Sequence, residues 1–143
     1  MIGEKEGETV TKVIAVVCLV GCLATTGVVC SEVEEAAIAD MIYAEAGDAP
    51  LICQLALAAV VFNRVRSQDY PNDVLSVLAD RGAFPHYDAS AAQKNSRTDE
   101  IMRIVRAAEF GFDPSFGATS FSFSAEESGV LHLAAGGMFF YGR

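Results

Sequence analysis

Apolar side chains recur at helical spacing along two adjacent segments of the chain, residues 31–46 and 50–66. The first segment opens with Ser31, followed three residues later by Glu34. This is the spacing of a capping box, so we expect a helix to begin there. The second segment is apolar almost all round, which is typical of a buried central helix. Gly47 and the Pro that opens the second segment predict a break between the two helices.

The apolar face of the first helix carries one carboxylate. Ile38, Met41 and Ile42 lie at i, i+3 and i+4, and the next position of that face, i+7, is Glu45. Burial and the negative end of the helix both disfavour the charged form of a carboxyl group. A Glu kept neutral near neutral pH is what a general acid requires. Glu45 is therefore a candidate catalytic acid, and a solvated surface Glu at the rim of the stripe is the alternative.

The second half of the chain predicts further helices and a small sheet. Apolar spacing favours a short helix at residues 74–78 and a longer one at 98–110. Residues 118–124 alternate between small or polar and aromatic side chains, a strand pattern, and residues 136–141 are expected to form the closing strand. The predicted fold class is α+β, a mainly helical domain with a small antiparallel sheet.

An uncharged apolar stretch, residues 13–29, precedes these elements and is expected to form a hydrophobic helix. It divides the chain into an N-terminal segment, 1–30, and a domain, 31–143. The stretch is consistent with an uncleaved signal anchor, with a cleaved signal peptide, or with a lipoprotein signal in which Cys22 is lipidated. A buried core helix is the remaining alternative.

The charges around this stretch favour one orientation. Two lysines precede it and acidic residues follow it, so the positive-inside tendency places the N-terminus in the cytoplasm. We therefore expect a membrane-anchored or secreted protein, with the membrane as a partner of the N-terminal segment and the domain on the extracytoplasmic side.

The first helical block carries a specific pattern. The run MIYAEAGDAPLICQLALAAVVFNRVRS resembles the start of the SleB/CwlJ-like cell wall hydrolase domain of spore-cortex-lytic enzymes. Its matching positions are Tyr43-Ala44-Glu45-Ala46, Pro50, Gln54, Ala56 to Val61 and Asn63-Arg64-Val65. The resemblance continues in order through Tyr70-Pro71-Asn72, Gly82-Ala83-Phe84, Asp113-Pro114, Gly117-Ala118 and Gly136 to Tyr141, and covers about residues 35–143.

The resemblance implies a lysozyme- or lytic-transglycosylase-like arrangement and cleavage of the MurNAc–GlcNAc bond of peptidoglycan. Glu45 would act alone, first as acid and then as base, while hydrolysis with two carboxylates is the alternative. Glycan strands are the implied partner, of spore cortex or of vegetative wall. Asn63 is implied to line or brace the cleft; an Asn that bonds backbone near a helix end is equally open.

Substrate contacts are expected on a loop and on the strands. The loop at residues 80–88 carries Phe84 and Tyr87, which are candidates for sugar contact, with simple packing as the alternative. His86 in the same loop is predicted to be an exposed loop histidine. Ser122 and Tyr141 are the substrate-binding candidates on the strands.

Composition disfavours some classes of partner and cofactor. The formal net charge of -9 argues against nucleic acid, because no basic patch is available to neutralise phosphates. The chain has two histidines and no Cys/His cluster with metal-ligand spacing, so we expect neither a metal nor a cofactor. Cys53 is predicted to be a buried structural thiol. A monomer is expected.

Two departures from the family pattern leave other functions open. Ser120 and Ser122 stand where larger aromatic or polar side chains are usual, and Met138 stands where a His is frequent. A catalytically impaired protein that binds glycans or assists another wall-lytic enzyme is therefore an alternative. An acidic interaction domain without a glycan role is a third possibility, which the block around Glu45 disfavours.

Overall fold

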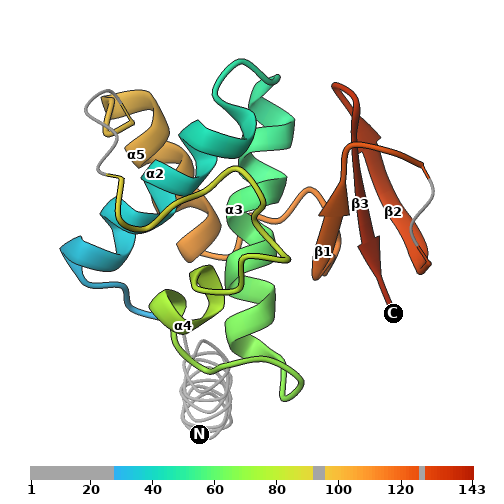
Figure 1. Cartoon of the computed structure of the whole chain (residues 1–143), viewed down its shortest axis with the longest axis horizontal. Coiled ribbons are helices and arrows are strands. Elements are labelled where there is room, and N and C mark those ends of the chain that lie inside the picture. The colour runs from blue at the N-terminus through green and yellow to red at the C-terminus, as the bar shows by residue number, and fades with distance from the viewer. Residues whose placement is uncertain (1–27, 92–95, 126–127) are drawn as a thin grey trace, which may run out of the picture.

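A computed structural model describes residues 28–91, 96–125 and 128–143 (Figure 1). The predicted N-terminal hydrophobic helix falls outside these residues, apart from its last positions. Among the described residues, no helix is both long and apolar enough to cross a membrane. Membrane attachment and lipidation at Cys22 therefore stay predictions from the sequence.

The helices lie where the apolar spacing predicts them. They are α2 (Glu32–Ala46), α3 (Leu51–Arg66), α4 (Val74–Leu78) and α5 (Asp99–Glu109). The capping box at Ser31 forms as expected, because its side chain accepts the N–H of Glu34 while the Glu34 carboxylate accepts the N–H of Ser31. This local signal fixes the start of α2 without a tertiary contact.

The second helix, α3, is the centre of the domain. It lies between the other helices and the sheet (Figure 1) and contacts α2, α4, α5 and β1. Its side chains from Ala56 to Phe62 are almost completely buried. The prediction of a buried central helix is thus confirmed, because neighbours on every side cover a helix that is apolar almost all round.

The sheet has three antiparallel strands, β1 (Ser120–Ser122), β2 (Val130–Ala135) and β3 (Met138–Gly142), in the order β1-β3-β2. Both predicted strands are confirmed, although β1 is shorter than expected. The sequence reading missed β2. It pairs with β3, and Gly136 and Gly137 connect the two strands. The φ values of these glycines, 55° and 78°, suit a two-residue hairpin turn.

The hairpin turn packs directly on the break between α2 and α3. A Cβ atom built on Gly136 would lie 2.7 Å from Pro50 Cδ and 3.0 Å from Cys53 Sγ. The Cys53 thiol is buried and donates to the Ala135 carbonyl at 3.1 Å. Cys53 is thus a buried structural thiol, as predicted, and it helps to join the sheet to the central helix.

The start of the described chain belongs to the same packed unit. Val28 and Cys30 pack against the core, and the Cys30 N–H donates to Glu109 Oε1 at 2.7 Å. Burial, followed by the nearby carboxylates Glu109, Glu34 and Glu35, raises the pKa of the Cys30 thiol to about 12. Cys30 is therefore an inert part of the domain, whereas the sequence reading counted only Cys53 in it.

Candidate active site

Glu45 lies in the last turn of α2, on the face that packs into the core. Ile38, Met41 and Ile42 share this face and are fully buried. The Glu45 side chain likewise has no exposed surface. The carboxyl group therefore continues a buried apolar stripe, as its i+7 position predicts, and is not a surface Glu at the rim.

One short stretch of the 80–88 loop binds both oxygens of this carboxyl group. Oε1 accepts the backbone N–H of His86 at 2.7 Å and that of Tyr87 at 3.0 Å. Oε2 lies 2.7 Å from Nδ1 of the His86 ring. Converging donors stabilise a carboxylate and fix its orientation. The loop and the helix together therefore fix the position of the Glu45 carboxyl group.

The role of His86 is a correction to the sequence reading. Its side chain is 58% exposed, as expected of a loop histidine, yet its ring contacts the candidate acid. The two residues are 41 positions apart in the chain. No local pattern signals a contact over that separation, because it depends on how the loop folds back over the end of α2.

A cleft of about 430 Å³ opens beside Glu45. Residues 43–49, around the end of α2, form its helical side, and Phe123, Gly136 and Met138 form its sheet side. Tyr43 and Phe123 are 39% and 46% exposed, so aromatic surface borders the cleft on both sides. The sequence reading assigned no role to either residue.

Gln54 holds the end of α2 that carries Glu45. Its Nε2 group donates to the carbonyls of Ala46 at 3.0 Å and Gly47 at 3.3 Å. The last carbonyls of a helix lack partners within the helix, so these bonds satisfy groups that would otherwise be exposed or unpaired. Gln54 thus positions the helix end from the neighbouring helix.

Arg64 holds the base of the loop that binds Glu45. Its Nε donates to the Thr119 carbonyl at 2.6 Å, and its NH1 group pairs with Asp80 at 3.3 Å. The guanidinium also lies over the Tyr70 ring at 4.7 Å and the Phe84 ring at 5.5 Å. One buried cation therefore connects α3, the loop and the approach to β1.

The two aromatic candidates of the loop have different surroundings. Phe84 is 1% exposed and packs against Phe121 with ring centroids 6.0 Å apart. Its ring is buried in this arrangement, which favours packing, the alternative to direct sugar contact. Tyr87 is partly buried against the core, and its backbone N–H binds Glu45. Burial and then Asp40 and Asp88 raise the pKa of the Tyr87 hydroxyl.

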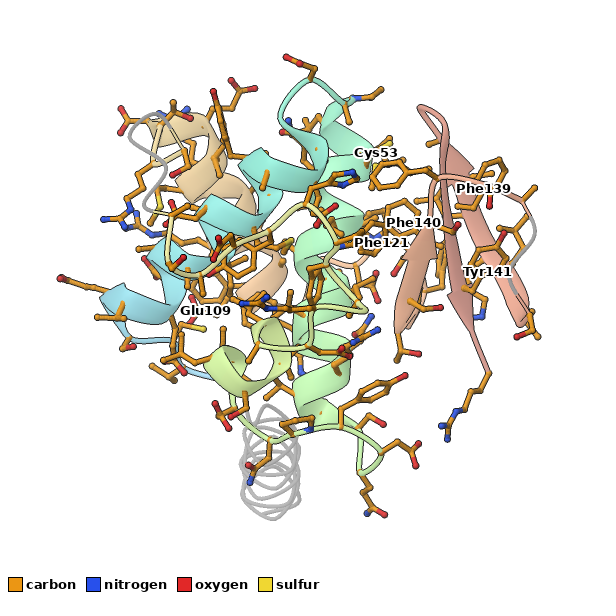
Figure 2. All side chains as sticks on the ribbon, in the orientation of Figure 1. Cys53, Glu109, Phe121, Phe139, Phe140 and Tyr141 are labelled. Atoms are coloured by element: carbon orange, nitrogen blue, oxygen red, sulfur yellow. The ribbon has the colours of Figure 1, made fainter. Side chains whose placement is uncertain are left out.

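The two strand candidates do not border the cleft beside Glu45. Figure 2 shows Phe121 and Phe140 on the side of the sheet that faces α3, with Phe139 and Tyr141 on the other side. Ser122 pairs in register with Phe139 and therefore shares that outer side. Tyr141 is only 4% exposed. A substrate role for Ser122 or Tyr141 would need a second contact surface outside this cleft.

Asn63 braces the chain that leads into the sheet. Its Nδ2 group donates to Asp113 Oδ2 and to the Ala118 carbonyl, both at 2.9 Å. Burial alone would raise the pKa of Asp113, but hydrogen bonds from Ser115, Asn63 and Gly117 outweigh it and lower that pKa. Of the roles open to Asn63, the structure favours bracing, since Asn63 does not border the Glu45 cleft.

Metal binding has no visible basis in the described part of the chain. No group of three or more His, Cys, Asp or Glu side chains is placed to hold an ion there.

The sequence of the domain matches a known protein family. Residues 48–135, more than half of the chain, match the family model described as Cell Wall Hydrolase. The chain belongs to this family. The match begins at Asp48, just after Glu45, and therefore does not include Glu45.

A curated relative points to the same group of enzymes. A spore cortex-lytic enzyme of Halalkalibacterium halodurans is 37% identical over 83 residues, which is 57% of this chain. The aligned stretch is 24% of that protein, so the chain spans about a quarter of the relative it matches.

Two solved structures share the fold. The catalytic domain of the Bacillus cereus SleB protein superimposes with a TM-score of 0.71 at 24% identity, covering 83% of this chain and 98% of that one. The catalytic domain of a germination-specific lytic transglycosylase, SleB from Bacillus anthracis, gives a TM-score of 0.70 at 24% identity, covering 83% and 100%. The predicted mixture of helices and a small antiparallel sheet is thus confirmed.

Proposed function

We propose that this cell wall hydrolase cleaves the MurNAc–GlcNAc bond of peptidoglycan as a lytic transglycosylase, with Glu45 as its acid and base. The observation that carries the proposal is a buried carboxyl group held at the edge of a cleft by two backbone donors. A fixed carboxyl group with restricted access to water is suited to general acid–base catalysis. The substrate lies outside the cytoplasm, in agreement with the localisation expected from the N-terminal segment.

The two carboxyl oxygens of Glu45 have different roles in the proposed reaction. Oε1 accepts two N–H groups, so a proton carried by Glu45 belongs on Oε2. That proton passes to the glycosidic oxygen as the bond to C1 breaks. The resulting carboxylate then takes the proton of the MurNAc 6-hydroxyl while O6 bonds to C1, which gives the 1,6-anhydro product.

Sugar contact is assigned to the exposed aromatic residues of the cleft. Tyr43 lies on the helical side and Phe123 on the sheet side, and each presents ring surface next to Glu45. Ligand pockets are commonly lined by aromatic side chains with a few polar groups that fix orientation. This pair replaces Phe84 as the proposed platform for the glycan strand.

Asp48 makes hydrolysis the competing chemistry. It is exposed and borders the same cleft as Glu45, so a second carboxylate is present at the site. A second carboxylate could activate water and yield a reducing-end product instead of an anhydro sugar. We favour the single-Glu route because Asp48 lies in the break after α2 and no donor to its carboxylate is among the described contacts.

The test is digestion of purified peptidoglycan by the full chain, with the products identified by mass spectrometry. Both spore cortex and vegetative wall are offered as substrates. Replacing Glu45 by Gln is expected to lower the rate on the order of 10²–10⁴-fold, because the amide cannot donate a proton. The matched replacement Asp48→Asn should retain the rate and the anhydro product. Reducing-end products that disappear in Asp48→Asn would reassign the reaction to hydrolysis.

A glycan-binding accessory protein is the second candidate. The observation that favours it is the complete burial of the Glu45 side chain under His86. A protein of this kind would bind glycan strands in a sedimentation assay and release no fragments from either wall type. Anhydro fragments from the wild type, absent with Glu45→Gln, would exclude it.

A further inference from the structure

The 80–88 loop places an imidazole between the buried carboxyl group and the surface of the domain. The Glu45 side chain has no exposed surface, whereas the His86 side chain is 58% exposed. One edge of the ring contacts Glu45 Oε2 through Nδ1. The ring also packs edge-on against Phe123, with centroids 5.3 Å apart and an interplanar angle of 71°. The imidazole thus contacts both the carboxyl group and Phe123, two groups that border the cleft, while His86 itself borders the neighbouring pocket of the loop.

The groups that bind the two carboxyl oxygens differ in how easily they can move away. Oε1 is bound by backbone N–H groups, which cannot leave unless the loop itself moves. Oε2 is bound by one exposed side chain, which can rotate about its own bonds. Oε2 is therefore the oxygen that can be uncovered while the carboxyl group stays in place.

We propose that His86 is a positioning residue that shares one proton with Glu45 and moves away from Oε2 when a glycan strand enters the cleft. This inference rests on the proposed function and assigns how the proton on Glu45 is kept in place between turnovers. In the resting pair, a single proton lies between Nδ1 and Oε2. An exposed imidazole exchanges protons with water, which the buried carboxyl group cannot do directly.

The proton balance of the cycle follows from this pairing. As the ring departs neutral, the shared proton stays on Oε2. Oε2–H then protonates the glycosidic oxygen, which also receives the electron pair of the breaking bond to C1. The carboxylate recovers a proton from the 6-hydroxyl as O6 bonds to C1. His86 returns to the re-protonated Glu45, so no proton is gained or lost overall.

Other titratable groups surround the pair on two sides. Tyr43 and Asp48 lie at the end of α2, and Arg81, Tyr87 and Asp88 lie in the loop, with Asp40 behind Tyr87. Hydrogen bonds from Ser90 lower the pKa of Asp88, so that group stays charged at neutral pH. The sheet side adds Phe123, Gly136 and Met138, none of which titrates. Within the described contacts, His86 is the group that meets the Glu45 carboxyl through an ionisable side chain.

The first experiment tests the shared proton without any substrate. The full chain is labelled at its histidine rings and its Glu carboxyl carbons, and both are followed by NMR across pH. Shared protonation predicts that His86 and Glu45 respond together and that the His86 curve changes in Glu45→Gln. His132 is the internal control, since its Nδ1 faces the Ser115 carbonyl and not Glu45. A His86 curve that is identical in wild type and Glu45→Gln would overturn the proposal.

The second experiment measures kcat and KM on soluble glycan fragments across pH. In His86→Asn, the amide can keep a hydrogen bond to Oε2 but has no basic nitrogen to share a proton with it. We expect KM to stay within about 2-fold and kcat at neutral pH to fall roughly 10- to 100-fold, with the alkaline limb displaced to lower pH. Added imidazole should restore part of the rate of His86→Ala but not of His86→Asn, which leaves no space for it.

The outcomes distinguish a failure of the proposed role of His86 from a failure of the proposed function. A His86→Asn variant with wild-type kcat and pH profile would overturn the positioning role. A His86→Ala variant faster than wild type would overturn it as well, because His86 would then only obstruct the site. If the wild type cleaves no peptidoglycan, the proposed function fails, and the NMR titration still decides whether the two residues share a proton.

Discussion

The helical and sheet sides of the cleft are built in opposite ways. On the helical side, the carboxyl group of the proposed acid, Glu45, is buried and hydrogen-bonded at both oxygens, and the loop that binds it is tied to α3 through Arg64. On the sheet side, the lining residues are Phe123, Gly136 and Met138, which present no polar side chain to the cleft. One side carries the proposed acid, and the other carries apolar surface.

This difference shows how a small domain can combine a fixed acid with an adaptable substrate surface. A carboxyl group needs an orientation that changes little, and helix ends and backbone donors provide it. An aromatic surface tolerates small shifts, since contact with a ring depends weakly on angle. Substitutions on the two sides should therefore affect different measured quantities.

The largest expected effect on stability comes from the ring that supports the loop of the helical side. Replacing the buried Phe84 by Ala should lower the free energy of unfolding by about 3–5 kcal/mol, because it leaves a cavity between the loop, Phe121 and Arg64. Urea denaturation measures this loss. Activity should fall as well, since the loop carries both backbone donors to Glu45.

Phe123→Ala is the matched Phe-to-Ala change on the sheet side. Phe123 is half-exposed, so the free energy of unfolding should change by about 1 kcal/mol or less. KM for glycan fragments should instead rise about 3- to 10-fold with little change in kcat. Equal stability losses in the two variants would contradict the contrast between the sides.

The attachment of the sheet side to the helices should be sensitive at one glycine of the hairpin turn. Gly136→Ala should cost about 3 kcal/mol, because the new Cβ atom would overlap Pro50 and Cys53 and the residue has a positive φ. Gly137→Ala is the control in the same turn. It also has a positive φ but meets nothing within 4 Å, so about 1 kcal/mol is expected. Thermal unfolding of both variants measures the difference, and equal losses would mean that the contact with α3 is unimportant.

A pH-dependent effect on stability is expected at the brace between α3 and β1. The pKa of Asp113 is lowered in the folded state, so its stabilisation is present above the unfolded pKa of about 3.9 and disappears as pH falls through the folded value. Asn63→Ala removes one donor to this carboxylate and should cost about 1–3 kcal/mol at neutral pH. The variant should also lose less further stability between neutral and acidic pH.

Denaturation at a series of pH values tests this prediction, with Asn72→Ala as the control at an exposed loop position. The control should follow the wild-type curve throughout. Parallel curves for wild type and Asn63→Ala would show that Asp113 does not depend on Asn63 for its low pKa.

Several features of the domain follow from local sequence. The capping box at Ser31, the apolar stripe with Glu45 and the continuous apolar character of α3 are set within a few residues, so their outcome does not require the rest of the chain. The sequence also contains a local signal for strand β2. Two glycines between apolar runs are a hairpin signal, and Gly136-Gly137 carries it. The sequence-based prediction instead placed these glycines at the start of the last strand.

Other features depend on residues that are distant in the chain. The sequence did not distinguish Phe84 from Phe123, because both are aromatic residues in or beside irregular segments. Only the packing of the loop against Arg64 and the sheet buries one ring and leaves the other exposed at the cleft. The outer positions of Ser122 and Tyr141 likewise depend on which face of the sheet meets α3.

By itself, the sequence determined the helices, the candidate acid and the class of fold, because periodicity and caps act over one or two turns of helix. Tertiary structure alone decided what surrounds that acid. The backbone donors at His86 and Tyr87, the imidazole at Oε2 and the aromatic surface of Phe123 reach Glu45 from more than 40 residues away. Contacts of that range arise from chain packing, which no pattern within a single segment records.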